Sequence, residues 1–277
     1  DYFYTRIYAS HLLSTAWTYG ATGDEWSLFY SRWLARRMLY LQRENAGVLR
    51  DRKGWARLPP WMEAEAAIAA YALFRETGDE ALLDIMGAWL EFAWHEAYEP
   101  GKGMPHRFAR GQEPEKFEHH WYPGVAAPLC YDALGDPKAL RITTEWAQSP
   151  LPHIHKGEFL QHPAGQSAAF VLTYLLKNRK DTEQPEGITD LKARPVKGGH
   201  VMLSWTAPKD RGSSSGSASR YWIKIAPKPI VDHPSFPEEL GSKLGFYQAD
   251  NIENEPVPSK GGTLERFLVE QLRPHGA

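Results

Sequence analysis

The chain has 277 residues, 42% hydrophobic and 24% charged, which is enough apolar material for two ordinary folded domains and excludes a disordered chain. A formal net charge of −2 argues against nucleic acid as a partner, because phosphate binding needs a surplus of basic residues. No apolar run approaches the roughly 20 residues that span a membrane, and the one cysteine, Cys130, excludes an internal disulfide and is expected to be buried.

A repeat organises the first two thirds of the sequence. The Gly-Asp pairs that begin at Gly23, Gly78 and Gly135 recur at intervals of about 55 residues, a period long enough for two helices and two connections. Glycine tolerates the left-handed conformation that closes a helix, and the aspartate after it can cap the next one. Each unit is therefore predicted to be a helical hairpin with its turn at Gly-Asp.

The two helices of each predicted hairpin differ in charge. The segments before the turns carry no acidic or basic residue, whereas those after the turns are amphipathic; they are 7–22, 66–74 and 119–131 before, and 24–44, 79–96 and 136–145 after. A helix that is apolar all round is buried, and an amphipathic one lies outside. Tryptophans of the outer helices are expected to pack between the two layers, at positions Trp26, Trp33, Trp89 and Trp146.

Inner and outer helices in alternation predict an α/α toroid, with an open superhelix of tetratricopeptide type as the alternative. The uncharged segment 159–176 is expected to be a further inner helix, which Pro163 starts, kinks or breaks. These helices make about half of a six-hairpin ring. Because the first residue is Asp1 rather than methionine, we expect the chain to be part of a longer product.

The remaining sequence predicts a second, all-β domain. Residues 1–178 form the helical domain, 179–187 a polar linker, and 188–277 a β-sandwich of short alternating strands. The segments ITDLKA, LSWTAP, RYWIKIA and FLVEQLRPHG, with Trp205 and Tyr221 as core anchors, resemble a bacterial fibronectin type III domain. That family has two further strands, so the sandwich is expected to be incomplete here and to be finished by further sequence or by another chain.

Parallel inner helices bring their starting ends to one mouth, entered by the segments 1–6, 46–62, 98–122 and 150–162. These segments hold most of the histidines and many Arg, Trp and Tyr residues. Aromatic faces stack on pyranose rings, while Arg and His bind hydroxyls and carboxylates, so the mouth suits a polysaccharide or oligosaccharide. The substrate-binding candidates are Arg107, Trp61, Trp121, Trp55, Tyr4 and Arg6.

The catalytic candidates are His119, His120, Tyr122, His106 and Glu63. Histidine titrates near neutrality, and Glu63 beside Trp61 could act as a general acid. Two alternatives stay open: hydrogen-bonding histidines without a catalytic role, and a Glu63–Glu65 pair that only favours the start of its helix. No metal-binding spacing such as HExxH occurs, so neither a metal nor a cofactor is expected.

The tyrosine-rich helix ending in TGD, the entry RLPPWMEAE (57–65) and the motif EHHWYPG (118–124) resemble the α/α-toroid domains of polysaccharide lyases and glycoside hydrolases, and most of all the exo-rhamnogalacturonan lyase-like or heparinase-like group. The resemblance implies that Arg107 and His106 neutralise a uronate carboxylate and that His119, His120 or Tyr122 removes the adjacent ring proton.

Three functions remain open. They are a lyase or hydrolase, which is favoured; a non-catalytic glycan-binding module; and a structural surface or filament subunit. A hydrolase would need two opposed carboxylates. The expected location is extracellular or at the cell surface, with the periplasm as an alternative.

Overall fold

The computed structural model describes residues 2–44, 60–105, 117–119, 121–149, 185–210, 216–234 and 241–270, together with positions 173, 177 and 239. The chain divides into two compact units. Unit 1 comprises residues 1–178 and 226–249, and unit 2 comprises residues 179–225 and 250–277. None of the described helices combines the length and apolar character needed to cross a membrane.

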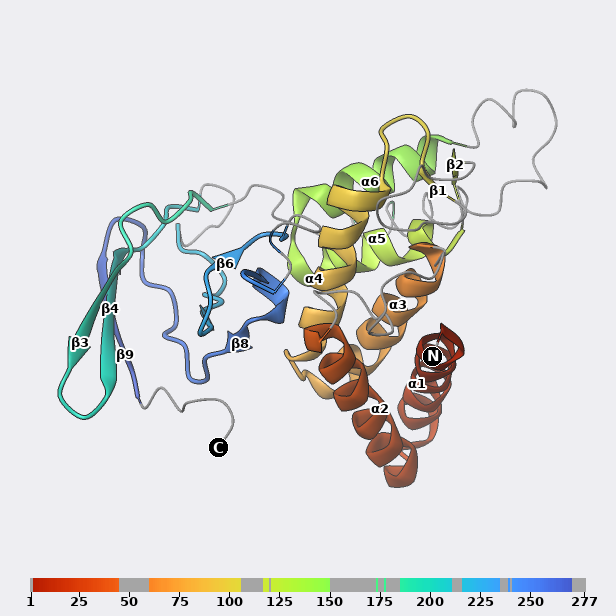
Figure 1. The fold of residues 1–277 in the computed structure, drawn as a ribbon, viewed down its shortest axis with the longest axis horizontal. Coiled ribbons are helices and arrows are strands. Elements are labelled where there is room, and N and C mark those ends of the chain that lie inside the picture. Colours follow the sequence, from red (N-terminus) through yellow and green to blue (C-terminus); the bar gives the residue numbers. More distant parts are fainter. Residues whose placement is uncertain are drawn as a thin grey trace. The chain divides into compact units, whose positions relative to one another are not determined.

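Unit 1 contains three helical hairpins within its described residues (Figure 1). They are α1 (Tyr2–Thr22) with α2 (Glu25–Glu44), α3 (Pro60–Thr77) with α4 (Leu82–Phe92), and α5 (Trp121–Leu134) with α6 (Pro137–Gln148). A short π-helical turn, η1 (Ala93–Ala97), extends α4. Helix α3 packs between α1 and α5, and each of these three helices also packs against its hairpin partner. The predicted hairpins are confirmed, while closure into a toroid stays a prediction.

The Gly-Asp turns form as the sequence predicts. Gly23, Gly78 and Gly135 have φ angles of 69°, 67° and 72°, the left-handed region that suits glycine. Their amides donate to carbonyl oxygens four residues earlier, at distances of 2.7, 2.8 and 2.9 Å. Each of these bonds closes the preceding helix.

The aspartates of the first and third turns cap the helices that follow, whereas Asp79 of the second turn bonds to the residue before α4. Asp136 Oδ1 accepts the Lys138 amide at 2.8 Å, and Asp24 Oδ2 accepts the Ser27 amide at the same distance. Asp79 Oδ1 accepts the Ala81 amide at 3.1 Å. A carboxylate thus satisfies an otherwise unpaired donor at the starts of α2 and α6, while the N-cap residue of α4, Ala81, has no side-chain cap.

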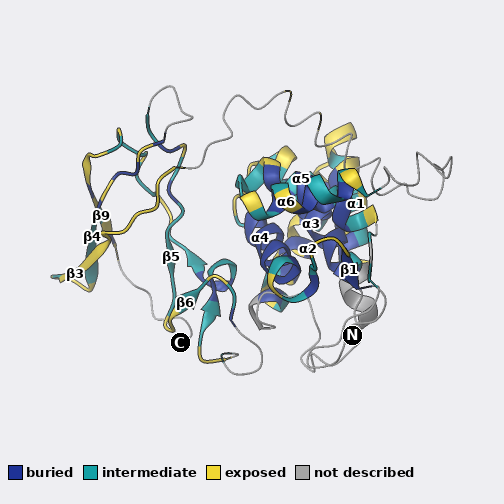
Figure 2. Ribbon diagram, turned by 90° about the horizontal axis from the view of Figure 1, so that it is seen from above, coloured by how far each residue is buried: buried dark blue, intermediate teal, exposed yellow. Residues whose placement is uncertain are grey.

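Helix α4 differs from the amphipathic outer helix that the sequence predicts. Every residue from Leu82 to Phe92 is buried, including Asp84 and Glu91 (Figure 2). Helices α2, α3 and α5 pack on α4, and so does a cover formed by the described residues of the segment 226–249, which belongs to unit 1. The segment thus groups with the helices of unit 1, whereas the sequence analysis placed it in the β-sandwich.

The covering segment contains a parallel pair of two-residue strands and a short helix. The strands are β6 (Ile230–Val231) and β7 (Leu244–Gly245), and the 3-10 helix η3 (Phe246–Gln248) packs on α4. Gln42 of α2 donates to the Asp84 carbonyl at 2.7 Å and to the Tyr247 carbonyl at 3.3 Å. One amide group therefore ties together α2, α4 and the cover.

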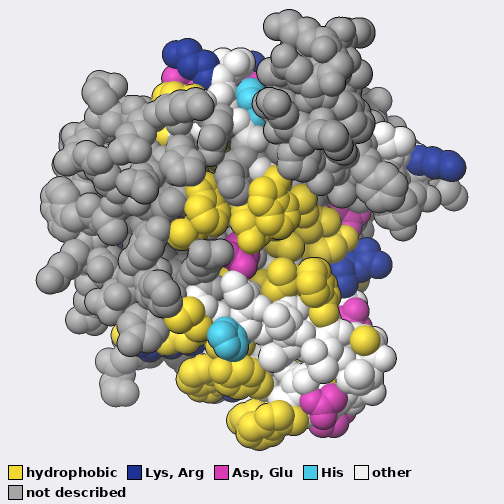
Figure 3. All heavy atoms as spheres, turned by 90° about the vertical axis from the view of Figure 1, so that its right-hand side faces the viewer, with side chains coloured by type: hydrophobic (Ala, Val, Ile, Leu, Met, Phe, Trp, Pro, Cys, Tyr) yellow, Lys and Arg dark blue, Asp and Glu magenta, His cyan; other side chains and the backbone are white. Residues whose placement is uncertain are grey.

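Helix α1 was expected to be buried, but one of its faces is exposed. Ile7, His11, Ser14 and Trp17 lie open to solvent, and Trp17 retains 63% of its surface. Among the described elements, α1 contacts mainly α2 and α3, so its remaining side has no helix against it. Figure 3 shows the side of the molecule on which α1 lies, with hydrophobic side chains open to view.

The outer tryptophans divide into two groups. Trp89 and Trp146 are 3% and 0% exposed and pack between helices as predicted. Trp26 and Trp33 are 71% and 50% exposed, so the prediction was wrong for this pair. Both tryptophans lie on α2, which forms with α1 the hairpin at one end of the described helices.

Unit 2 has small antiparallel sheets. The largest has the order β3 (Lys192–Val196), β4 (His200–Thr206) and β9 (Leu264–Val269), and β5 (Lys224–Ile225) pairs with β8 (Asp250–Asn251). Trp205 is 2% exposed, and its ring meets Tyr221 edge-on at 5.0 Å between centroids, as expected for core anchors. Strands in this part are confirmed, while a complete sandwich stays a prediction.

Candidate functional site

A short antiparallel ladder brings His119 to the start of helix α5. Met104 and Pro105 form β1, which pairs with β2 (Phe117–Glu118) immediately before His119. His119 Nε2 lies 3.0 Å from Glu145 Oε1 on α6. A carboxylate can only accept, so the imidazole donates Nε2–H, and a neutral ring then carries its lone pair on Nδ1. A histidine held by a carboxylate in this way can accept or donate a proton near neutral pH.

Glu145 is fixed by two further donors. Its Oε2 accepts the Tyr98 hydroxyl at 2.5 Å and the Gly101 amide at 3.0 Å. Tyr98 directly follows η1. The wider π-helical turn therefore ends at a position from which the Tyr98 hydroxyl reaches Glu145 on α6. All three bonds hold the carboxylate in one orientation, and that orientation fixes the imidazole.

The two acids of this network are shifted in opposite directions. Partial burial disfavours the charged form of Glu145, but hydrogen bonds from Gly101, Tyr98 and His119 outweigh it and lower the pKa of the carboxyl. Burial together with the bond to Glu145 raises the pKa of Tyr98 to about 12. Near neutral pH the Tyr98 hydroxyl is therefore protonated and donates the hydrogen bond, and the charged Glu145 carboxylate accepts it.

The imidazole is partly accessible. The side chains of His119 and Glu145 are each 20% exposed. One edge of the His119 ring meets the buried Trp146 at 4.7 Å between centroids, with an interplanar angle of 71°. The histidine is thus clamped by a carboxylate and an indole while part of its surface reaches solvent.

A run of aromatic rings lies at the starts of α3 and α5. Trp61 stacks on Tyr122 at 5.7 Å with an angle of 11°, and Trp121 stacks on the same tyrosine at 3.7 Å with an angle of 27°. Trp121 is 42% exposed. Two predicted entry segments therefore meet, and they bring together three of the predicted site residues, of which Trp121 lies two positions after His119 in the chain.

Glu63 and Glu65 lie in the interior. They are 4% and 5% exposed, and Glu65 Oε1 accepts the Ser10 hydroxyl of α1 at 2.5 Å. Residues two apart on a helix face in different directions, so these two carboxylates do not form an opposed pair. Glu63 sits in the first turn of α3, where a negative charge favours the helix start.

The other predicted site residues lie outside the described part of the chain. This holds for His106, Arg107, His120 and Trp55, and for the side chains of Tyr4 and Arg6, whose backbone is part of α1. Within the described residues, no group of three His, Cys, Asp or Glu side chains is placed to hold a metal ion.

Sequence reasoning missed Glu145 and Tyr98. Glu145 belongs to the amphipathic helix after the third Gly-Asp turn, where a charged residue reads as solvated. Tyr98 lies between α4 and the β1–β2 ladder and has no local signal.

Comparison of the chain with protein-family models, curated proteins and solved structures finds no match.

Proposed function

We propose that the protein binds a uronate-containing polysaccharide across Trp61, Tyr122 and Trp121 and cleaves it by β-elimination, with His119 as the base. The observation that carries this proposal is the His119–Glu145 pair, which is 3.0 Å apart and partly exposed, on a histidine two residues before Trp121 in the chain. An extracellular or cell-surface location goes with such a substrate.

The proposed reaction follows from the orientation of the imidazole. Nδ1 of His119 takes the proton from C5 of the uronate, and those electrons form the C4–C5 double bond as the C4–oxygen bond breaks. The imidazolium then returns its proton to the departing oxygen, so the chain is cut without water. Glu145 stabilises the charged imidazolium between these steps and keeps the ring in place.

Neutralising the uronate carboxylate would make the C5 proton easier to remove. Arg107 and His106 remain the proposed groups for this role on the resemblance described above. The exposed face of Trp121 supports the binding part, because aromatic faces stack on the apolar faces of sugar rings.

Hydrolysis fits the described site less well. It needs two carboxylates on opposite sides of the bond, whereas Glu63 and Glu65 are buried on one helix and Glu145 already holds His119. Glycan binding without turnover is the second candidate, and the stacked Trp61–Tyr122–Trp121 run favours it as directly as it favours binding by an enzyme.

The test is incubation with polygalacturonate, rhamnogalacturonan, alginate, chondroitin and heparin while the ultraviolet absorbance of the unsaturated product is followed. We expect one of these polymers to be cleaved and H119Q to lower kcat by about 10² to 10⁴ fold. H11Q, an exposed histidine on α1, is the matched control and should retain full activity. Unchanged turnover in H119Q refutes the base assignment, and binding without product selects the glycan-binding function.

A further inference from the structure

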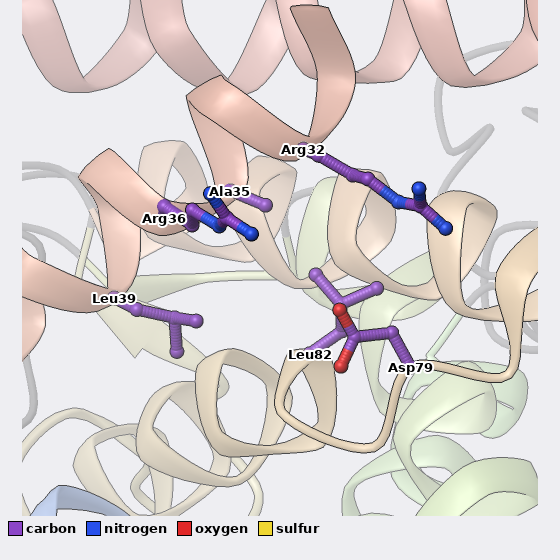
Figure 4. A pocket seen from close by; sticks show the side chains of 6 residues that line it. All are labelled: Arg32, Ala35, Arg36, Leu39, Asp79 and Leu82. Atoms are coloured by element: carbon purple, nitrogen blue, oxygen red, sulfur yellow. The ribbon is translucent and has the colours of Figure 1, made fainter. Parts of the chain in front are cut away.

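A pocket lies between α2 and the turn that precedes α4. It has a volume of about 270 Å³ and is lined by Arg32, Ala35, Arg36, Leu39, Asp79 and Leu82 (Figure 4). Trp61 is near the start of α3, and Asp79 lies just beyond its end. The 18 residues of α3 at 1.5 Å each separate the two sites by about 27 Å.

The positive charges of this pocket come from one face of α2. Arg32 and Arg36 are one helical turn apart on α2, and both line the pocket across from Asp79 and Leu82 (Figure 4). Among the described residues, no carboxylate forms an ion pair with either arginine. Two guanidiniums over one hollow can therefore bind a planar anion such as a carboxylate.

The rest of the lining is not that of a simple anion site. Asp79 Oδ1 accepts the Ala81 amide, so the carboxylate is fixed in place, and its remaining acceptor capacity suits hydroxyl donors. Ala35, Leu39 and Leu82 supply an apolar wall. A bare inorganic anion would leave this wall unused and would meet the charge of Asp79.

We propose that the Arg32–Arg36 pocket binds one uronate residue, with its carboxylate on the arginines, its hydroxyls on Asp79 and its ring against the leucines. The choice of a sugar acid rests on the proposed function. The volume fits a ligand of about one ring, because pockets for drug-sized ligands start at about 300 Å³. The pocket would hold a second part of the polysaccharide, or a released uronate, away from the cleavage site.

The aromatic residues next to the pocket fit a longer ligand. Phe29 lies one turn before Arg32 on the same side of α2 and stacks on Trp26 at 5.4 Å. Both rings are exposed, Phe29 by 60% and Trp26 by 71%. A sugar that adjoins the uronate would find a stacking surface there, which predicts tighter binding of an oligogalacturonide than of the monosaccharide.

The experiment is a titration of the full chain, labelled with ¹⁵N-arginine, with galacturonate, galactose, sulfate and a short oligogalacturonide. We expect galacturonate to shift the Arg32 and Arg36 Nε–H signals, and R36Q to weaken this binding about tenfold, as loss of one charge-assisted contact implies. R37Q is the matched control, because Arg37 lies over the ring of Tyr40 and does not line the pocket.

Each arm has a defined outcome. Galactose should leave both signals unmoved. Sulfate binding as tight as galacturonate would overturn the assignment to a sugar acid, and so would equal loss of binding in R37Q and R36Q. If the oligogalacturonide binds more tightly than galacturonate, the pocket is a subsite for the polymer. Equal affinities indicate a site for the monosaccharide. The H119Q variant separates this inference from the proposed function, because it should lose elimination and keep the galacturonate-induced shifts.

Discussion

The ring of Tyr247 lies directly against Gly87 in the middle of helix α4. A Cβ atom on Gly87 would be 2.2 Å from Cε1 of Tyr247 and 2.3 Å from Cδ1 and Cζ, closer than atoms can approach. The packing of Tyr247 on α4 therefore requires a residue without a side chain at position 87, although the two residues are far apart in sequence. The contact also explains why a helix expected at the surface is buried on all sides.

Substituting Gly87 by alanine should destabilise unit 1. The added methyl group must push Tyr247 off α4, and overpacking of this kind costs about 1 to 3 kcal/mol. Urea unfolding followed by circular dichroism gives the value. G20A is the control, because the Cβ there would meet only the flexible end of Glu76, at 2.8 Å. Alanine should be neutral or slightly stabilising in that helix. Equal stability of G87A and the native chain would contradict the packing of Tyr247.

The parts of unit 1 that sequence alone predicts are the local ones. A Gly-Asp turn needs only a left-handed glycine and a capping carboxylate a few residues away, so its signal is complete within a short window. The cover of α4 is different, because residues 226–249 reach α4 from a distant part of the chain and carry strand-like patterns. Exposure of Trp26 and Trp33 also escaped prediction, since helical spacing says which residues share a face but not whether that face is covered.

The third Gly-Asp turn offers a test of the turn mechanism. G135A forces alanine into a φ of 72°, which costs about 1 to 2 kcal/mol, whereas G135N should cost less because asparagine tolerates this conformation. D136A removes the bond to the Lys138 amide and should cost about 0.5 to 2 kcal/mol. Urea midpoints rank the three variants, and a G135N variant less stable than G135A would reject the left-handed turn as the cause.

The Tyr98–Glu145 bond should give stability a defined dependence on pH. The folded pKa of Glu145 is lower than its ordinary 4.5, so its contribution is present above that pH and lost as pH falls through the folded value. The pKa of Tyr98 is raised from 10.0 to about 12, so its contribution is present below pH 10 and lost as pH rises through about 12.

Replacing Tyr98 by phenylalanine should therefore destabilise the protein most between these limits and progressively less toward either extreme. Thermal unfolding of the native chain and Y98F across the pH range measures the difference, with Y19F on α1 as a tyrosine control. A destabilisation by Y98F that stays constant from acid to alkaline pH would show that the hydroxyl contributes through packing and not through this bond.

The candidate site shows the same division between local and distant information. Trp61, Trp121 and Tyr122 could be predicted to meet, because each begins a helix of the inner layer and equivalent ends of parallel helices gather together. Glu145 could not, because it sits on a helix whose charged residues look solvated. Its role depends on the position of α6 beside His119, which only the packing of the third hairpin fixes.

Truncation of Trp121 should affect binding more than chemistry. The indole is 42% exposed and makes its ring contact with Tyr122, so W121A removes a stacking surface without emptying the core. We expect KM to rise about tenfold, or about 1.4 kcal/mol, with a smaller change in kcat and little change in unfolding temperature. W17A is the control, since Trp17 is a solvent-exposed tryptophan on α1, with 63% of its surface open, and is not part of the stacked rings. A fall in kcat alone would place Trp121 in the chemistry instead.

The cover of α4 should open locally when His233 is changed. His233 Nε2 donates to Glu96 Oε1 at 2.7 Å, and its ring stacks on His95 at 5.3 Å with an angle of 4°. Both partners of the hydrogen bond are largely buried, with side-chain exposures of 9% and 13%, so its loss should cost about 1 to 3 kcal/mol. Phenylalanine keeps a ring for the stack and removes the bond, whereas alanine removes both.

Hydrogen exchange can therefore separate the two contacts. We expect faster amide exchange in the described parts of residues 226–249 in H233F, and faster exchange still in H233A, while α1 and α3 keep their native rates because the described contacts of the cover are with α2, α4 and η1. H11A, on the exposed face of α1, should change none of these rates. Uniform acceleration across unit 1 in H233F would mean that the cover unfolds only together with the helices, and not as a separate element held to α4 by this histidine.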